Sequence, residues 1–441
     1  MAVANNPFTS TTQQNAQRVF LAETAINYQN EADVWSMYQT WEDTPINAKG
    51  TQVPLETSPN PSLSIPNVDN GPTPSVGARA LDSMTINYAP LMQGRGETYG
   101  AILNNNKETA EDEIMRNAES DLKQQIKFLN DYVSRGDGTA ALGIVSAYTN
   151  PSTTVTLNGT SDSIGPSQLV VNQYVTFWNS TGATQRVGTV GSGAIQIASK
   201  TASTIVLAGN APSDVVAGDI VAPEIGTTDA TTALRGLAHI ISASGTYFGK
   251  SRSSVTQLQS YELTSAGTLT AAQLFTAYAS MKQRGGYFSE KLEEQLQILV
   301  NVSQYANYYN LSLSSGAVVG SPNYLVHQGD SRPQMDVGMA KFDFTWFGAP
   351  IKVCNSLRGD EIYFTNPKYL KKAVLKNIGE LPDVMPHSEY LPLYNSAGYP
   401  LLSRVTYRDF IGQAFSPTPH KLGKISGITL GTLPTQKALM V

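Results

Sequence analysis

The sequence predicts an α+β fold that carries an inserted all-β, barrel-like domain. Three observations support this prediction. A long helical stripe at 108–134 precedes evenly spaced, short β-type runs at 151–228. The rest of the chain, 229–441, mixes helices with strands that do not arrive in βαβ order. A chain of 441 residues has room for about three domains.

Composition excludes several classes of protein. Charged residues make up only 15% of the chain while Tyr alone occurs 21 times, which argues against disorder. A net charge of −5 argues against a basic nucleic-acid reader. No apolar run approaches 18 residues, and the N-terminus lacks the features of a signal peptide. A surface covered by Ser, Thr, Asn, Gln and Gly is expected where other protein chains face it.

The first hundred residues are predicted to be largely extended. Apolar side chains at near-helical intervals in 11–41 predict one or two short amphipathic helices. Prolines recur through 43–106 and exclude a long helix there, so we expect an excursion with a two-stranded hairpin. Because an isolated hairpin is marginal in water, a neighbouring subunit should order it. The docking face would be the alternating residues Met84, Ile86 and Tyr88, with Leu91 just beyond.

The stripe at 108–134 predicts one long helix. Ile114, Ala118, Leu122 and Ile126 recur at steps of four, and no Pro or Gly interrupts them. The first turns are acidic, as the helix dipole prefers. Gly136 and Gly138 should end the helix.

Residues 151–228 differ from the rest, with six charged residues among short runs rich in Val, Ile and Thr. Regular turn signals between these runs predict a small antiparallel barrel or sandwich. In 229–441, Thr270 and Gln273 form a capping box that opens a helix ending near Arg284. Strands are expected at 296–300, 341–347, 350–354 and 361–366, a second helix at 305–311, and a late strand pair at 401–416.

No motif indicates catalysis, a cofactor or a metal. The single cysteine, Cys354, lies in an apolar run and is expected to be a small buried residue. Four scattered histidines lack ligand spacing. The glycines at 94–100 and 136–138 match no nucleotide-binding motif. The acidic residues at 111–113 suit an exposed helix start. The sequence therefore predicts a protein that is not an enzyme and has no cofactor.

A basic cluster occurs late in the chain. Lys368, Lys371, Lys372 and Lys376 are spaced three, one and four apart, which predicts a one-sided helical patch. Residues 1–150 carry a net charge of −8 and residues 229–441 a net charge of +5. The patch would bind either phosphate or, with higher odds, an acidic neighbouring subunit. The difference in charge between the two ends of the chain is also compatible with an ordinary fluctuation of composition.

The order of these pieces resembles the major capsid protein of tailed bacteriophages, which has the Hong Kong 97-like shell fold. Three strings resemble recurrent passages of phage coat proteins: "RGDGTAALG" at 135–143, "RGLAHII" at 235–241 and "GTYFGKSRS" at 245–253. The resemblance implies an N-terminal arm at 1–45, an extended loop at 46–106, and a spine helix with the start of the peripheral domain at 107–150. It further implies an inserted β-domain at 151–228, a mainly axial domain at 229–366 and a return to the peripheral domain at 367–441.

The same resemblance implies a function. The chain would form hexamers and pentamers of an icosahedral shell around double-stranded DNA, without sequence-specific DNA binding. Its partners would be further copies, a portal protein, a separate scaffolding protein and a decoration protein, and it would assemble in the host cytoplasm. The alternatives are a tail, fibre or other self-assembling surface protein, and an enzyme with an unrecognised site. Expected assembly contacts are Met84, Ile86, Tyr88, Leu91, Arg95, Lys368, Lys371, Lys372 and Lys376.

Overall fold

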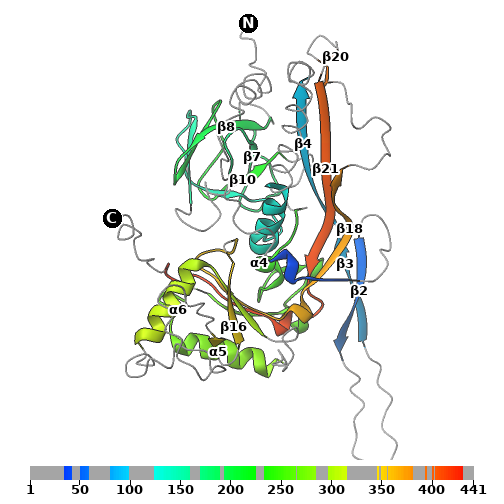
Figure 1. The fold of residues 1–441 in the computed structure, drawn as a ribbon, viewed down its shortest axis with the longest axis vertical. Coiled ribbons are helices and arrows are strands. Elements are labelled where there is room, and N and C mark those ends of the chain that lie inside the picture. The colour runs from blue at the N-terminus through cyan, green and yellow to red at the C-terminus, as the bar shows by residue number, and fades with distance from the viewer. Residues whose placement is uncertain are drawn as a thin grey trace, which may run out of the picture.

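The computed structural model combines a long β-sheet, a closed barrel and a second sheet covered by helices (Figure 1). None of the helices in the described part of the chain is long and apolar enough to cross a membrane. The described residues are 34–41, 50–58, 80–98, 124–158, 169–188, 193–224, 233–264, 266–284, 296–314, 345–346, 349–354, 356–380, 393–394, 400–401 and 403–430.

A helix over residues 124–135 lies at the centre of the molecule (Figure 1). Leu129 and Val133 are buried, as their place on the predicted stripe requires. The helix ends where the glycines predict, and the Gly136 N–H donates to the Tyr132 carbonyl oxygen at 2.7 Å. Residues 108–123 of the expected helix lie outside the described residues.

The long sheet has four strands in the order β1–β18–β21–β4. β1 (Gln39–Thr40) is parallel to β18 (Lys371–Glu380), and β21 (Ser403–Phe415) is antiparallel to both β18 and β4 (Ala89–Thr98). The expected late strand pair at 401–416 is therefore wrong. β21 is one continuous strand because it has a partner along each edge, while the short β20 (Pro400–Leu401) pairs with β19 (Leu393–Tyr394).

A two-stranded hairpin extends from the end of this sheet, and its presence confirms the predicted hairpin (Figure 1). Its strands are β2 (Gly50–Ser58) and β3 (Ala80–Asn87). Met84 and Ile86 are 0% exposed and belong to the main core of the chain. The expectation that only a neighbouring subunit could order the hairpin is thus wrong for its base, which packs on its own subunit.

The inserted domain is a closed six-stranded barrel. Its alternating inward residues, such as Val145, Val155 and Ile205, are fully buried. The barrel begins at β5, before the boundary expected at 151, because β5 closes it between β6 and β10. The strands are β5 (Gly143–Ala147), β6 (Thr154–Leu157), β7 (Tyr174–Trp178), β8 (Ile195–Lys200), β9 (Thr204–Leu207) and β10 (Ile220–Pro223).

A second, six-stranded sheet has its own core with the helices α5 (Ala271–Gln283) and α6 (Val302–Ser314). The predicted capping box is confirmed: Thr270 Oγ1 accepts from the Gln273 N–H at 3.3 Å, and Gln273 Oε1 accepts from the Thr270 N–H at 2.9 Å. The strand order is β13 (Tyr261–Leu263), β22 (Gly423–Ile425), β17 (Ile362–Thr365), β14 (Gln297–Val300), β16 (Ala349–Val353) and β15 (Thr345–Trp346).

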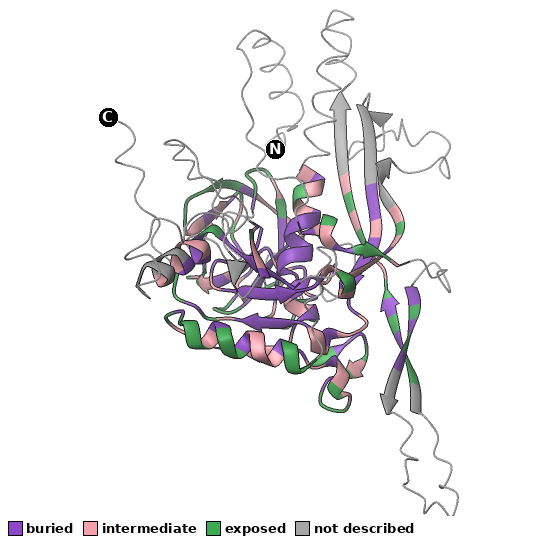
Figure 2. Ribbon diagram, turned by 60° about the horizontal axis from the view of Figure 1, so that its bottom comes forward, coloured by how far each residue is buried: buried purple, intermediate pink, exposed green. Residues whose placement is uncertain are grey.

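Short elements connect these parts, and the buried residues concentrate where the parts meet (Figure 2). The short elements are η1 (Trp35–Met37), α4 (Leu237–Ile240), β11 (Thr246–Tyr247), β12 (Lys250–Ser251), η3 (Thr256–Leu258), η5 (Pro367–Tyr369) and η7 (Pro419–Lys421).

Candidate functional site

The two strings at 235–241 and 245–253 pack against each other. The Arg235 guanidinium lies 4.6 Å from the centre of the Phe248 ring, at cation–π distance. The His239 ring stacks on Tyr247 with 5.5 Å between centroids. Two segments that looked separate along the chain therefore form one aromatic and cationic cluster beside α4.

Arg252 stabilises this cluster from the interior of the subunit. Its side chain is buried, and its guanidinium donates to backbone carbonyl oxygens rather than to a carboxylate. Because a buried cation needs such partners, the residue fixes the path of the backbone around it. The acceptors are the carbonyl oxygens of Ser242 at 2.9 Å, Ile240 at 3.3 Å, His239 and Leu258.

The turn between β11 and β12 is strained. Phe248 has a φ of 44° and Gly249 a φ of 82°. A positive φ is unusual for a bulky residue and costs on the order of 1–3 kcal/mol. The Tyr247 ring, 4.8 Å away and edge-on, and the Arg235 guanidinium hold Phe248 in place.

This turn presents Lys250 to the hairpin. Lys250 Nζ lies 2.6 Å from the Asp82 carboxylate on β3. Hydrogen bonds from Lys250 and from the Ser83 N–H lower the pKa of Asp82. The strained turn therefore ties the hairpin to the body of the subunit.

Two glycines meet at the end of the central helix. The Gly236 N–H donates to the Gly136 carbonyl oxygen at 2.9 Å. A Cβ on Gly236 would lie 2.3 Å from the carbonyl oxygens of Tyr132 and Val133, so a side chain cannot fit there. Glycine at 236 is what allows the segment before α4 to lie against the helix end.

His239 is buried beside this contact. Burial, together with the charges of Arg235 and Arg252, lowers the pKa of His239 to about 3. Its Nε2 atom is buried without a hydrogen-bond partner. The imidazole is therefore neutral at ordinary pH and acts as a packing group.

Asn130 joins three distant parts of the chain. Its Oδ1 accepts from the N–H groups of Val34 at 3.0 Å and Trp35 at 3.2 Å, and its Nδ2 donates to Ser356 Oγ at 3.1 Å. Trp35 then packs edge-on against Phe410, with 5.4 Å between ring centroids. The N-terminal segment 34–41 is thereby docked on the central helix and the long sheet.

The expected docking face of the hairpin needs correction. Met84 and Ile86 are buried within their own subunit, so neither presents a free surface. Tyr88 and Leu91 are half-buried, and Arg95 belongs to β4 with its side chain outside the described residues. Met92, which the sequence did not single out, is 57% exposed on β4.

The predicted helical lysine patch is also wrong. Lys368 lies in η5, while Lys371, Lys372 and Lys376 lie on strand β18, because β18 pairs along its length with β21. Lys372 covers the Trp35 ring at 4.8 Å, and Lys376 forms an ion pair with Asp409. The structure does not bring these four residues together on one helical face.

Two cations from distant parts of the chain lie near η7 instead. Lys421 Nζ lies 4.5 Å from the centre of the Tyr369 ring. Arg284 donates to the Gln259 carbonyl oxygen at 3.2 Å, and His420 Nδ1 lies 2.9 Å from the Gln257 carbonyl oxygen. No spacing in the sequence could have revealed these contacts.

The described residues give no indication of a metal site or of a reactive cysteine. They hold no group of three His, Cys, Asp or Glu side chains that could bind a metal ion. Cys354 is buried, as its apolar surroundings predict. The acidic residues at 111–113 lie outside the described part of the chain.

Comparison with known proteins was informative only at the level of structure. No protein-family model and no curated protein sequence matches this chain. A chain of the solved structure described as the Cyanophage A-1(L) capsid asymmetric unit superposes with a TM-score of 0.53 at 11% identity, over 92% of this chain and 95% of that one.

Two other phage structures are less similar. A chain from Mycobacterium phage Bobi has a TM-score of 0.44 at 9% identity, over 93% of both chains. One from Mycobacterium phage Cain has a TM-score of 0.43 at 8% identity, over 94% of both. The cyanophage match, which spans nearly the whole length of both chains, shows that this chain has the Hong Kong 97-like capsid fold that the order of its segments predicted.

Proposed function

We propose that this protein is the major capsid protein of a tailed bacteriophage, which assembles as hexamers and pentamers into an icosahedral shell around double-stranded DNA. The observation that carries the proposal is the superposition on a cyanophage capsid chain over 92% of this chain and 95% of the other. Coverage of both chains almost end to end matters, because a shared subdomain alone would leave one of them largely unmatched.

The properties of the chain suit this role. With only 15% charged residues, its surfaces can approach one another at modest desolvation cost. Because the net charge is −5, the shell does not attract the packaged DNA as a basic protein would. In this proposal the shell requires a portal protein and a separate scaffolding protein, carries a decoration protein, and forms in the bacterial cytoplasm without catalytic activity of its own.

The hairpin and β4 are the proposed contact with a neighbouring copy. Of the predicted face, Tyr88 and Leu91 stay partly accessible on their own subunit, and the neighbouring Met92 is 57% exposed. The proposed contact also includes Arg95. The division into domains that the resemblance implies is part of the proposed function as well. Trypsin cleavage near Arg79 or Arg95 should be fast in free subunits and slow in shells; equal rates would contradict this contact.

Electron microscopy of the purified protein tests the function directly. Closed shells or isolated capsomers, with or without a scaffolding partner, are expected. Tubes or fibres would support a tail or fibre protein instead. Discrete monomers at high concentration under all conditions would overturn the proposal.

A further inference from the structure

The barrel exposes apolar side chains at the turn before β7. Val170 and Val171 are each 40% exposed, and Tyr174 is 45% exposed. A backbone hydrogen bond of 3.1 Å closes the turn that they flank. Lys200 Nζ reaches the start of this turn and donates to the Leu169 carbonyl oxygen at 2.6 Å. We name this group of residues the first barrel end: Val170, Val171, Tyr174 and Lys200.

A second exposed apolar pair lies elsewhere on the barrel. Val216 is 52% exposed, and Val187 is exposed as well. The Asp219 carboxylate accepts from the Val216 N–H at 2.9 Å. The same carboxylate pairs at 2.9 Å with Arg186, the residue before Val187. Asp214, two residues before Val216, adds a second carboxylate, so this group carries more negative than positive charge. We name it the second barrel end: Arg186, Val187, Asp214, Val216 and Asp219.

The two barrel ends lie at opposite ends of β7. Tyr174 is the first residue of that strand. Asp219 directly precedes Ile220, which pairs with Trp178, the last residue of the strand. The four residue steps between Tyr174 and Trp178 correspond to about 13 Å. The barrel therefore has two separate apolar surfaces rather than one continuous patch.

The first barrel end is positively charged. Burial and, to a smaller extent, the charge of Lys127 on the central helix lower the pKa of Lys200, so two cations lie near each other here. Glu224 follows β10 beside the start of β7 and balances only one of them. Each end of the barrel is thus complementary, in charge and in apolar surface, to the other end of an identical barrel.

We infer that the first barrel end of one subunit binds the second barrel end of a second copy. Such a contact joins two different surfaces, so it continues from copy to copy until a ring closes. It gives the barrel the task of joining neighbours within a hexamer or pentamer, and in this it rests on the proposed function. A different protein would bind one end and leave the apolar residues of the other end exposed to water.

Engineered cysteines test this contact in the full chain. The single native cysteine, Cys354, is buried, so Val171→Cys and Val216→Cys introduce accessible thiols on a silent background. In assembled protein that carries both changes, oxidation with copper phenanthroline should link each copy to the next. Non-reducing gels should then show a ladder of products from dimer to hexamer, which free subunits do not give.

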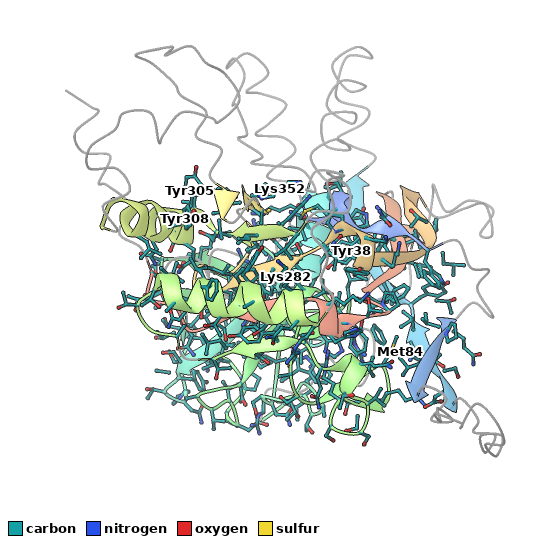
Figure 3. All side chains as sticks on the ribbon, turned by 90° about the horizontal axis from the view of Figure 1, so that it is seen from below. Tyr38, Met84, Lys282, Tyr305, Tyr308 and Lys352 are labelled. Atoms are coloured by element: carbon teal, nitrogen blue, oxygen red, sulfur yellow. The ribbon has the colours of Figure 1, made fainter. Side chains whose placement is uncertain are left out.

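Single variants distinguish a head-to-tail contact from a symmetric one. An equimolar mixture of the two single variants should stop at the dimer, because each chain then has one reactive thiol. Val171→Cys/Lys352→Cys, whose second thiol replaces an exposed lysine of β16 (Figure 3), is the matched control and should give no ladder. Dimers from Val171→Cys alone would mean that like ends meet, and would overturn the inference. If the double variant does not assemble, the mixture of single variants decides.

Charge changes test whether the contact contributes to assembly. Val171→Asp brings a carboxylate against the acidic second barrel end. It should raise the protein concentration needed for assembly about tenfold, which corresponds to 1.4 kcal/mol. Adding Val216→Lys to the same chain should restore assembly to within about threefold of the wild type by light scattering. Urea unfolding verifies that each variant is folded. Normal assembly of Val171→Asp would contradict the inference.

The remaining outcomes separate this inference from the proposed function. Shells of the double cysteine variant that give no links would overturn the inference. So would thiols at 171 and 216 that react with maleimide as fast in shells as in free subunits, which would leave both ends for another partner. Tubes in place of shells would overturn the proposed function, while a ladder in those tubes would still support the barrel contact. A strictly monomeric wild type would overturn both.

Discussion

Replacing Asn130 by alanine should release the N-terminal segment from the subunit. The side chain accepts two hydrogen bonds, from the buried Val34 N–H and the partly buried Trp35 N–H, and donates one to Ser356. A buried N–H that loses its acceptor costs about 1–3 kcal/mol, and the partly buried one costs less because water can reach it. Alanine regains about 0.5 kcal/mol of helix propensity. The net loss in free energy of unfolding should therefore be about 2–3 kcal/mol.

Two measurements report this effect. Urea unfolding gives the free energy, and hydrogen exchange of residues 34–41 shows whether the segment detaches locally before the subunit unfolds. Exchange at Val34 and Trp35 should accelerate by far more than exchange in α5. Lys127→Ala, at an exposed position of the same helix, should change stability by less than about 0.5 kcal/mol. Unchanged exchange at Val34 together with unchanged stability would refute the role given to Asn130.

Four further predictions follow from the geometry. Gly236→Ala should lower the free energy of unfolding, measured in urea, by about 3 kcal/mol, because its Cβ would overlap backbone oxygens. Gly209→Ala, which has open space around it, should lower it by less than about 1 kcal/mol. His239 has a folded pKa of about 3, below its ordinary 6.5, so the unfolded chain binds a proton that the folded chain does not. Stability should therefore fall as the pH drops from 6.5 toward 3, and the loss at pH 5 should reach about 2 kcal/mol. A His239→Gln variant that keeps the same dependence of stability on pH would contradict this. Lys250→Glu should speed hydrogen exchange in β3, and adding Asp82→Lys should restore it, whereas no recovery would show that the pair does not tie down the hairpin. The barrel, residues 143–223, should unfold cooperatively with a β-type circular dichroism spectrum when expressed alone, and a disordered fragment would contradict its independence.

Local chemistry made part of this fold predictable from sequence. The Thr270–Gln273 capping box lies within one turn and correctly placed the start of α5. In the barrel, β-branched runs between turn residues predicted strands where β6 and β9 occur. In each case the signal and the structure it specifies lie within a few residues of each other.

Long-range pairing explains what the sequence could not show. The lysine spacing near 371 suits a helix and a strand equally, and only the partner strand β21 decides for the strand. β5 is a short run directly after the central helix, and its place in the barrel depends on β10, far along the chain. The contact between Lys421 and the Tyr369 ring joins two segments that are far apart in sequence, so no local pattern could predict it.

The pairing of β5 with β10 bears on how such a chain could arise. Gly143 lies opposite Val221, and the Leu142 N–H donates to the Val221 carbonyl oxygen at 2.8 Å. Residues directly opposite each other in an antiparallel pair have Cα atoms about 4.5–5.5 Å apart. The chain thus leaves for the barrel and returns from it at nearly the same point in space. A gene could therefore gain, lose or exchange the whole barrel in one recombination event and leave the path of the remaining polypeptide unchanged.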